Sequence, residues 1–212
     1  GVDQWSKESQ TTNNLYDSKS YYYINVEGND GKRILPMQQP SAASNVLLTV
    51  FDDTQYYEVD NVNIVRLGRR WFGEEFDFVD QQNFQFKIPN IETSTPISLY
   101  IFAAAVSIVN TSMEVKSNDV FVANMPFTPI GSSLKADSSI LNTTIPASEN
   151  IKISLKYNNG GVPDSKGYLD YISLKSKRNL IGYGKQFPFR YDLSSTSTQI
   201  GEFQISNAST IK

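Results

Sequence analysis

Ile151-Lys152-Ile153-Ser154-Leu155-Lys156-Tyr157 is the clearest alternation of apolar and polar residues in the chain. Successive side chains of a β-strand point to opposite faces, so this stretch predicts a strand with one buried and one solvated face. Such strands are typical of antiparallel sheets that pack face to face in a sandwich. A run of Asn, Gly and Pro at residues 158–164 predicts a turn, and we expect the strand that follows from Tyr168 to pair with the first.

The same signals recur along the whole chain. Runs rich in β-branched and aromatic residues alternate with clusters of Asn, Gly, Pro, Asp and Ser, and no stretch shows helical periodicity with a cap at both ends. We predict strands at residues 21–26, 46–51, 84–88, 97–105, 113–115, 120–123, 151–157, 168–174, 187–192 and 199–205, with a short turn of helix at 40–45. The predicted fold class is all-β: an antiparallel β-sandwich of jelly-roll or galactose-binding-like type.

The composition excludes most enzyme chemistry. The 212 residues include no His and no Cys, but twelve Tyr, twelve Phe and two Trp. Without these residue types there is no imidazole base, no thiolate nucleophile and no zinc site built from His and Cys. What remains possible is paired-carboxylate chemistry, as in an independent hydrolase, an oxygen-ligand metal site, or no chemistry. We expect no catalytic residue, no metal site and no cofactor in this chain.

Length, charge and hydropathy indicate one domain and argue against nucleic-acid binding and a transmembrane segment. A domain of about 200 to 250 residues is common among all-β proteins, so we predict one domain over residues 1–207, with residues 1–19 as an N-terminal extension packed on it. The net charge is −3 and no basic stripe is present, which argues against nucleic acid as a partner. The longest apolar stretch, residues 97–109, is too short for a transmembrane segment.

Acidic residues gather in one part of the chain, where their oxygens could bind Ca²⁺. Their spacing does not match an EF-hand loop, so solvated loop acids are the favoured interpretation. The residues are Asp52, Asp53, Asp60, Glu74, Glu75, Asp77 and Asp80.

Gly68-Arg69-Arg70-Trp71-Phe72-Gly73-Glu74-Glu75-Phe76 has a poor pattern for a regular strand and predicts an ordered loop. The structural residues would be Gly68 and Gly73, which allow tight turns. Trp71 and Phe72 would anchor the loop, while Arg69 or Arg70 could pair with Glu74, Glu75 or a partner. Since an exposed ion pair contributes little stability, a recognition role is at least as plausible. The predicted contact set is Arg69, Arg70, Trp71, Phe72 and Glu74.

Asp170 breaks the apolar pattern of its strand. In regular alternation it shares a face with Tyr168, Ile172 and Leu174. A buried carboxylate must be paired or hydrogen-bonded, and Arg178 or a loop backbone N–H is the expected partner. Both Asp170 and Arg178 are therefore predicted to be structural, and Asp170→Ala should lower the melting temperature.

The aromatic residues offer a second functional hypothesis. Tyr and Trp faces can stack on pyranose rings, so they could form the platform of a carbohydrate-binding module or adhesin domain. Burial in the core is the favoured alternative for most of them. The candidates are Trp5, Tyr16, Tyr21, Tyr22, Tyr23, Tyr56, Tyr57 and Trp71.

Several segments resemble one family in the same order along the chain. They are residues 14–18, 20–23, 57–58, Asn61, 68–76, 167–172 and 177–180. Together they resemble the region before the peptidase domain of the PorU-type sortases of the Bacteroidetes type IX secretion system, which are related to gingipain cysteine peptidases. The Gly-Arg-Arg-Trp-Phe-Gly-Glu and Leu-Asp-Tyr-Ile segments are specific in combination.

This resemblance implies a parent enzyme at the extracellular face of the outer membrane that removes C-terminal sorting domains from cargo and joins the cargo to anionic lipopolysaccharide. Its catalytic Cys and His lie in the peptidase domain, so none can be carried over to this chain. The chain would be a non-catalytic accessory domain, with residues 208–212 beginning the linker to the peptidase domain. Implied partners are that peptidase domain, secreted cargo and secretion-machinery proteins, with glycan as the alternative.

Overall fold

The computed structural model describes residues 21–26, 31, 35–36, 38, 40–65, 70–132, 135–186 and 188–211. Within these residues the chain is almost entirely β, with two short 3-10 helices near its C-terminal end. The strands are β1 (Val46–Leu48), β2 (Val50–Glu58), β3 (Glu75–Phe76), β4 (Gln81–Lys87), β5 (Ile97–Val106), β6 (Thr111–Ser117), β7 (Val120–Phe127), β8 (Asp137–Ile145), β9 (Asn150–Asn158), β10 (Lys166–Asn179) and β11 (Gly201–Phe203). The helices are η1 (Asp192–Ser195) and η2 (Ala208–Thr210).

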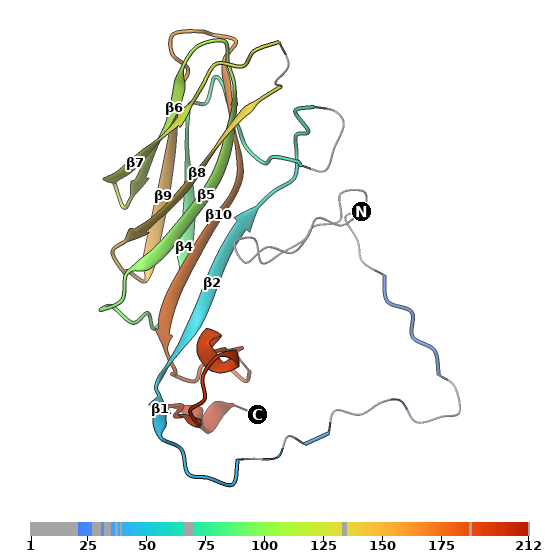
Figure 1. Ribbon diagram of the computed structural model, residues 1–212, viewed down its shortest axis with the longest axis vertical. Coiled ribbons are helices and arrows are strands. Elements are labelled where there is room, and N and C mark those ends of the chain that lie inside the picture. The colour runs from blue at the N-terminus through green and yellow to red at the C-terminus, as the bar shows by residue number, and fades with distance from the viewer. Residues whose placement is uncertain are drawn as a thin grey trace.

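Two antiparallel sheets pack face to face (Figure 1). The first has the order β2-β10-β5-β8, with β3 pairing beside β2 on β10, and the second has the order β4-β9-β6-β7. Among the eight long strands, every step along the chain except that from β6 to β7 crosses between the sheets. Eight strands interleaved in this way form a jelly roll. The predicted all-β, antiparallel sandwich is therefore confirmed.

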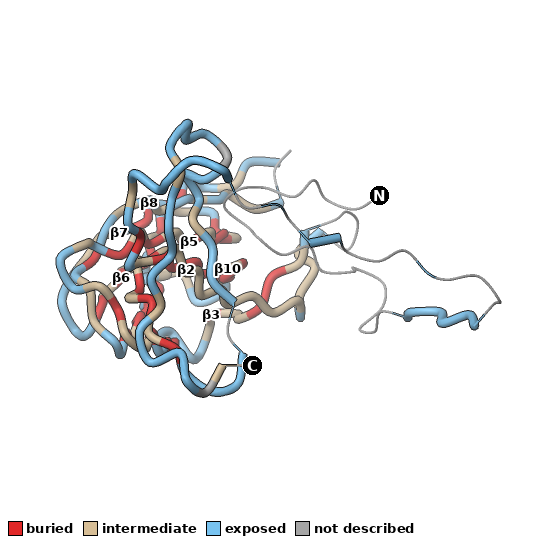
Figure 2. Tube along the Cα trace, turned by 90° about the horizontal axis from the view of Figure 1, so that it is seen from below, coloured by how far each residue is buried: buried red, intermediate tan, exposed pale blue. Residues whose placement is uncertain are grey.

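The core lies between the sheets, where Figure 2 shows the buried residues gathered. Ile151, Ile153, Leu155 and Tyr157 of β9 all point into it, as the alternation predicts. Ser154 is also buried, and its hydroxyl donates to Asn83 Oδ1 at 2.6 Å on the neighbouring strand, which satisfies this polar group. Burial of these side chains is the main force that holds the two sheets together.

The expected pairing of β9 with β10 is wrong. β9 pairs with β4 and β6, whereas β10 pairs with β2, β3 and β5 in the opposite sheet. The turn between β9 and β10 carries the chain across the sandwich rather than back along one sheet. A buried bond between the Tyr157 and Ser165 hydroxyls (2.8 Å) joins the two sides of this crossing.

Several predicted elements differ from the structure. Residues 21–26 are exposed and form no strand, and residues 40–45 contain bends instead of a turn of helix. In the predicted strand 187–192, the described part contributes a single bridge from Arg190 to Asp52 before η1 begins. Conversely, β8 was not expected, because it is an edge strand whose side chains are mostly polar and only Ile145 is buried.

A small layer caps one end of the sandwich. β1 and β11 form a parallel pair, seen at the lower end of Figure 1 with the C-terminal segment. Ile205 and Ile211 pack against the buried side chains of Phe51 and Leu180, which joins this layer to the sandwich. The domain boundaries at 1–207 and 208–212 stay predictions, and residues 1–19 lie outside the described residues. No helix in the described part of the chain is long and apolar enough to cross a membrane.

Candidate functional site

The predicted loop lies between β2 and β3, on the outer side of the first sheet. Of its residues, Gly68 and Arg69 lie outside the described residues. Phe72 and Val62 exchange two backbone hydrogen bonds of 2.8 Å each, so an antiparallel bridge joins the two ends of the loop. The Phe72 side chain is 5% exposed and packs against Ala104 and Tyr168. Phe72 is therefore the anchor of the loop and presents little surface to a partner.

Gly73 is needed for a close approach rather than for an unusual backbone angle. A Cβ at this position would lie 2.7 Å from the carbonyl oxygen of Val59. Its backbone N–H donates to the carbonyl of Leu169 at 2.8 Å, which ties the loop to β10. The structural role of Gly73 stays a prediction, and its basis in the structure is this close approach to Val59.

Arg70 and Trp71 precede the buried Phe72, and Arg70 is exposed. The Arg70 guanidinium lies 4.2 Å from the centroid of the Phe102 ring, and its Nη1 lies 3.4 Å from Asp170 Oδ2. Its partner is thus Asp170, rather than Glu74 or Glu75 as expected. Trp71 is half-buried. The Arg70 side chain lies beside strand β5, through its contact with Phe102.

Asp170 sits at a β-bulge. The register between β10 and β5 shifts between Leu169 and Tyr171, and an extra residue of this kind reverses the alternation beyond it. Leu169 and Ile172 consequently both point into the core, so Asp170 does not share a face with Ile172 as regular alternation predicts. Asp170 is 6% exposed, which is consistent with a structural role, and the effect of Asp170→Ala stays a prediction.

Arg178 is not the partner of Asp170. Its Nε donates to the carbonyl of Pro89 at 2.7 Å, and its Nη1 lies 3.2 Å from Asp53 Oδ2. The guanidinium also lies over the rings of Phe51 and Tyr183, at 5.1 and 5.5 Å from their centroids. Arg178 therefore joins the end of the sandwich to the C-terminal layer, as a buried structural cation.

Glu74 turns away from solvent. The Tyr57 hydroxyl donates to Glu74 Oε1, while Oε2 is buried without a hydrogen-bond partner among the described residues. Burial, and then the hydrogen bond and negative charge of Glu74, raise the pKa of Tyr57 to about 12. The Tyr57 ring packs on Phe84 of the second sheet, at 4.9 Å between centroids. Glu74 thus fixes the base of the loop and is a poor candidate for direct recognition.

Lysine and arginine side chains pair with five of the other acids. Lys166 lies 2.6 Å from Glu75 Oε1 and 3.2 Å from Asp77 Oδ2, and these hydrogen bonds raise the pKa of Lys166. Burial first, and then the charge of Glu75, raise the pKa of Tyr168 to about 12. Ion pairs also join Asp52 to Lys177, Asp53 to Arg178 and Asp80 to Lys156. Among the described residues, no three acidic side chains converge as a metal site would require.

Three rings form a row on the outer face of the first sheet, which we call the outer aromatic row. Tyr56 stacks on Tyr171 at 5.4 Å and Tyr171 stacks on Phe102 at 6.1 Å between centroids. Of the predicted platform, Tyr56 belongs to this row, whereas Trp5 and Tyr16 lie outside the described residues. Sequence analysis missed Phe102 and Tyr171, although the period-two pattern of residues 97–106 could have placed Phe102 on the outer face.

The arrangement defines a class: a jelly-roll β-sandwich with an ordered loop and an aromatic row on one outer face. No family model matches the chain, and no curated protein matches it. Among solved structures, dimeric latent PorU from Porphyromonas gingivalis is similar at a TM-score of 0.67 and 18% identity. The match covers 79% of this chain and 16% of the PorU chain, so this chain spans a small part of that protein. At this identity the likeness shows a shared fold.

Carbohydrate-binding modules give weaker likenesses. A module of family 36 in complex with calcium and xylotriose has a TM-score of 0.38 and 13% identity, over 60% of this chain and 99% of the module. A family 35 module from Clostridium thermocellum has a TM-score of 0.35 and 12% identity, over 63% of this chain and 98% of the module.

Proposed function

We propose that this chain is a non-catalytic accessory β-domain of a PorU-type sortase of the type IX secretion system, N-terminal to its cysteine peptidase domain. The observation that carries the proposal is the shared fold with PorU over 79% of the chain at a TM-score of 0.67. The loop and Leu-Asp-Tyr-Ile segments that resemble the family support it, because they meet at one place: Arg70 of the loop pairs with Asp170.

The accessory role follows from what the chain contains. It has no Cys and no His, so the nucleophile and base of a cysteine peptidase must come from another part of the parent protein. In this proposal the domain acts at the extracellular face of the outer membrane. It positions the peptidase domain or contacts cargo and secretion-machinery proteins.

Arg70, Trp71 and the outer aromatic row are the proposed contact surface. Arg and large aromatic side chains contribute most to binding at protein interfaces. The guanidinium of Arg70 already contacts the Phe102 ring and Asp170, which favours one position before a partner arrives. Arg69 stays in the proposed contact set, while Phe72 and Glu74 support the surface from below.

The test is binding between the purified 212-residue chain and the isolated peptidase segment of its parent, measured by biolayer interferometry. Trp71→Ala and Arg70→Ala should weaken binding at least tenfold, the usual loss at an interface hot spot of about 1.4 kcal/mol or more. Gln85→Ala, on an exposed position of β4 in the second sheet, is the matched control and should bind normally. Absence of binding by the unaltered chain would reject the proposal.

The alternative function is a carbohydrate-binding module or adhesin domain. The predicted platform for it is dispersed, because Tyr21, Tyr22 and Tyr23 are exposed outside the sandwich while Tyr57 packs on the core. A glycan panel and the peptidase-binding assay, run with the same chain, together separate the two functions. Glycan binding without peptidase binding would favour the alternative.

A further inference from the structure

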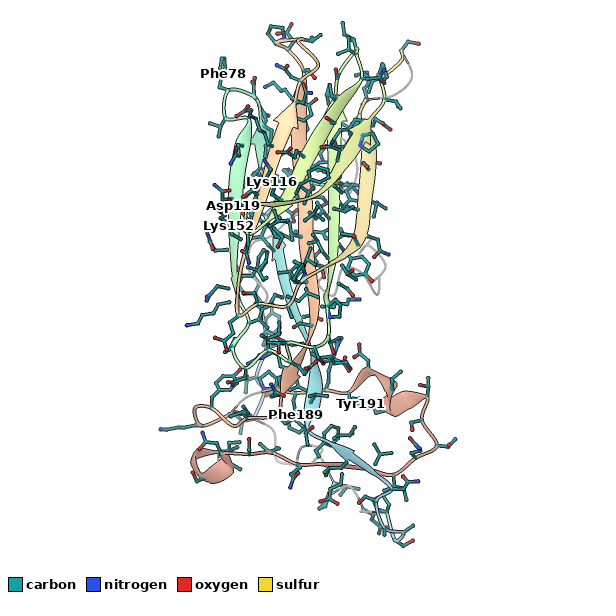
Figure 3. All side chains as sticks on the ribbon, turned by 90° about the vertical axis from the view of Figure 1, so that its left-hand side faces the viewer. Phe78, Lys116, Asp119, Lys152, Phe189 and Tyr191 are labelled. Atoms are coloured by element: carbon teal, nitrogen blue, oxygen red, sulfur yellow. The ribbon has the colours of Figure 1, made fainter. Side chains whose placement is uncertain are left out.

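A concave site lies at the end of the sandwich that carries the C-terminal layer, and we call it the C-terminal hollow. It has a volume of about 330 Å³ and is formed by β1, β11 and the segment from Tyr191 through η1 to Gln199. Figure 3 places Phe189 and Tyr191 at this end of the molecule. The lining residues are Val46, Leu48, Tyr191, Leu193, Ser194, Thr196, Ser197, Gln199, Gly201 and Phe203.

Hydrogen bonds to Asn45 and to Asp52 of β2 hold the segment that forms one wall of the hollow. Asp52 Oδ2 accepts the backbone N–H of Asp192 at 2.8 Å, and Asn45 Oδ1 accepts that of Ile200 at 3.0 Å. These two bonds fix the ends of the segment that arches over the hollow. Lys177 of β10 lies 5.3 Å from the centroid of the Tyr191 ring and so positions that wall.

The aromatic wall continues into the sandwich. Phe203 lies 6.5 Å from Tyr191 and 5.2 Å from Phe189 between centroids, each pair meeting edge to face. Phe189 in turn meets the buried Phe51 at 6.5 Å. This chain of rings keeps Tyr191 and Phe203 in place, so the hollow is preformed.

None of the ten lining residues is charged. The lining combines apolar side chains, among them Leu48 and the rings of Tyr191 and Phe203, with hydroxyl and amide groups. Two of those polar groups hold the segment itself, because the Thr196 hydroxyl donates to the carbonyl of Leu193 and the Ser197 hydroxyl accepts the N–H of Gln199. The exposed side chains of Ser194 and Gln199 remain to meet a ligand.

We propose that the C-terminal hollow binds a neutral sugar ring of a glycan. A pyranose has an apolar C–H face that fits an aromatic ring and a hydroxyl edge that fits amide and hydroxyl groups. A charged ligand would lose hydration without finding a counter-charge among the lining side chains. The volume lies at the lower end of the roughly 300–1,000 Å³ typical of small-molecule sites, so the occupant is a short saccharide. This inference goes beyond the accessory-domain role and does not depend on it.

The test is saturation-transfer NMR with the 212-residue chain and a panel of methyl glycosides of neutral hexoses and N-acetylhexosamines. At least one glycoside should receive saturation, most strongly at its ring C–H protons. Gln199→Ala should weaken its binding about fivefold, the loss that accompanies one neutral hydrogen bond. Ser194→Phe should abolish binding, because an aromatic ring at this lining position would fill the hollow.

Gln85→Ala is the matched control, since Gln85 is an exposed residue of β4 in the opposite sheet, and it should bind like the unaltered chain. Circular dichroism melting curves establish that all variants are folded. The proposal is overturned if no neutral glycoside receives saturation, or if the Gln199 and Ser194 variants bind as well as the control. Binding of an apolar peptide by a chain that binds no glycoside would also overturn it and would identify the hollow as a peptide site.

Discussion

Gly73→Ala is the substitution that tests how the loop is held against the sandwich. The new Cβ would lie 2.7 Å from the carbonyl oxygen of Val59 and 3.2 Å from the Val59 Cβ. The oxygen belongs to the backbone, so the contact cannot be relieved by rotating a side chain. Either the loop or the end of β2 must shift, which would also disturb the hydrogen bond from Gly73 to Leu169.

The expected magnitude combines two opposing effects. Overpacking of this kind typically costs about 1–3 kcal/mol. Replacing Gly with Ala restricts the unfolded chain, which returns about 0.4–1 kcal/mol. We therefore expect a net loss of about 1–2 kcal/mol in the free energy of unfolding, and a melting temperature lower by about 2–8 °C for a chain of this length.

Differential scanning calorimetry of Gly73→Ala and Gly131→Ala provides the comparison. A Cβ at Gly131 would have no atom within 4 Å, and Gly131 is not among the glycines with positive φ. Gly131→Ala should therefore leave the melting temperature unchanged or slightly higher. If Gly73→Ala melts like Gly131→Ala, the close approach of the loop to Val59 does not exist in solution.

Three further predictions concern charged and ionisable groups. Arg178→Met should lower the free energy of unfolding by about 3 kcal/mol in urea denaturation, since it leaves Asp53 without its buried partner. A loss below about 1 kcal/mol, which is the range of exposed ion pairs, would contradict this prediction. The pKa of Tyr57 is raised to about 12, so the contribution of Tyr57 to stability is fully present below pH 10 and is lost as the pH rises through 12. Ultraviolet titration should therefore show that Tyr57 ionises at higher pH than an exposed tyrosine. Glu74→Gln should lower the pKa of Tyr57 only in part, because burial remains the largest cause of the shift. Hydrogen bonds from the Thr95 hydroxyl and the Ser94 backbone N–H lower the pKa of Glu92 to about 2. The contribution of Glu92 to stability is therefore present above pH 4.5 and is lost as the pH falls through 2. An NMR titration midpoint of Glu92 near 4.5 would contradict this prediction.

The sequence predicted the class of fold because period-two alternation reports directly on burial. It did not predict which strands pair, since the alternation of β9 is the same whatever strand lies beside it. In a jelly roll, neighbours along the chain belong mostly to opposite sheets, so the usual preference for pairing consecutive strands fails at the step from β9 to β10. β8 was missed because an edge strand with one polar face and few buried residues carries little apolar signal.

The sequence predicted that residues 68–76 form an ordered loop, but it did not predict which residues the loop contacts. The mixture of charges, aromatics and glycines in residues 68–76 indicated an ordered loop, and the structure places its described part on the first sheet. The partner of Asp170 could not be derived, because a bulge that depends on the neighbouring strand reversed the alternation at that residue. Pairing of Arg70 with Asp170 joins segments that are 100 positions apart, a distance over which sequence patterns carry no information on contact.

The most direct test of the accessory role is hydrogen–deuterium exchange of this chain with and without the peptidase segment of its parent. The proposal predicts slower exchange at residues 70–76 and at the part of β10 around Asp170, because the partner would cover the loop and the outer aromatic row. Unchanged exchange at both places under saturating peptidase segment would contradict the proposal.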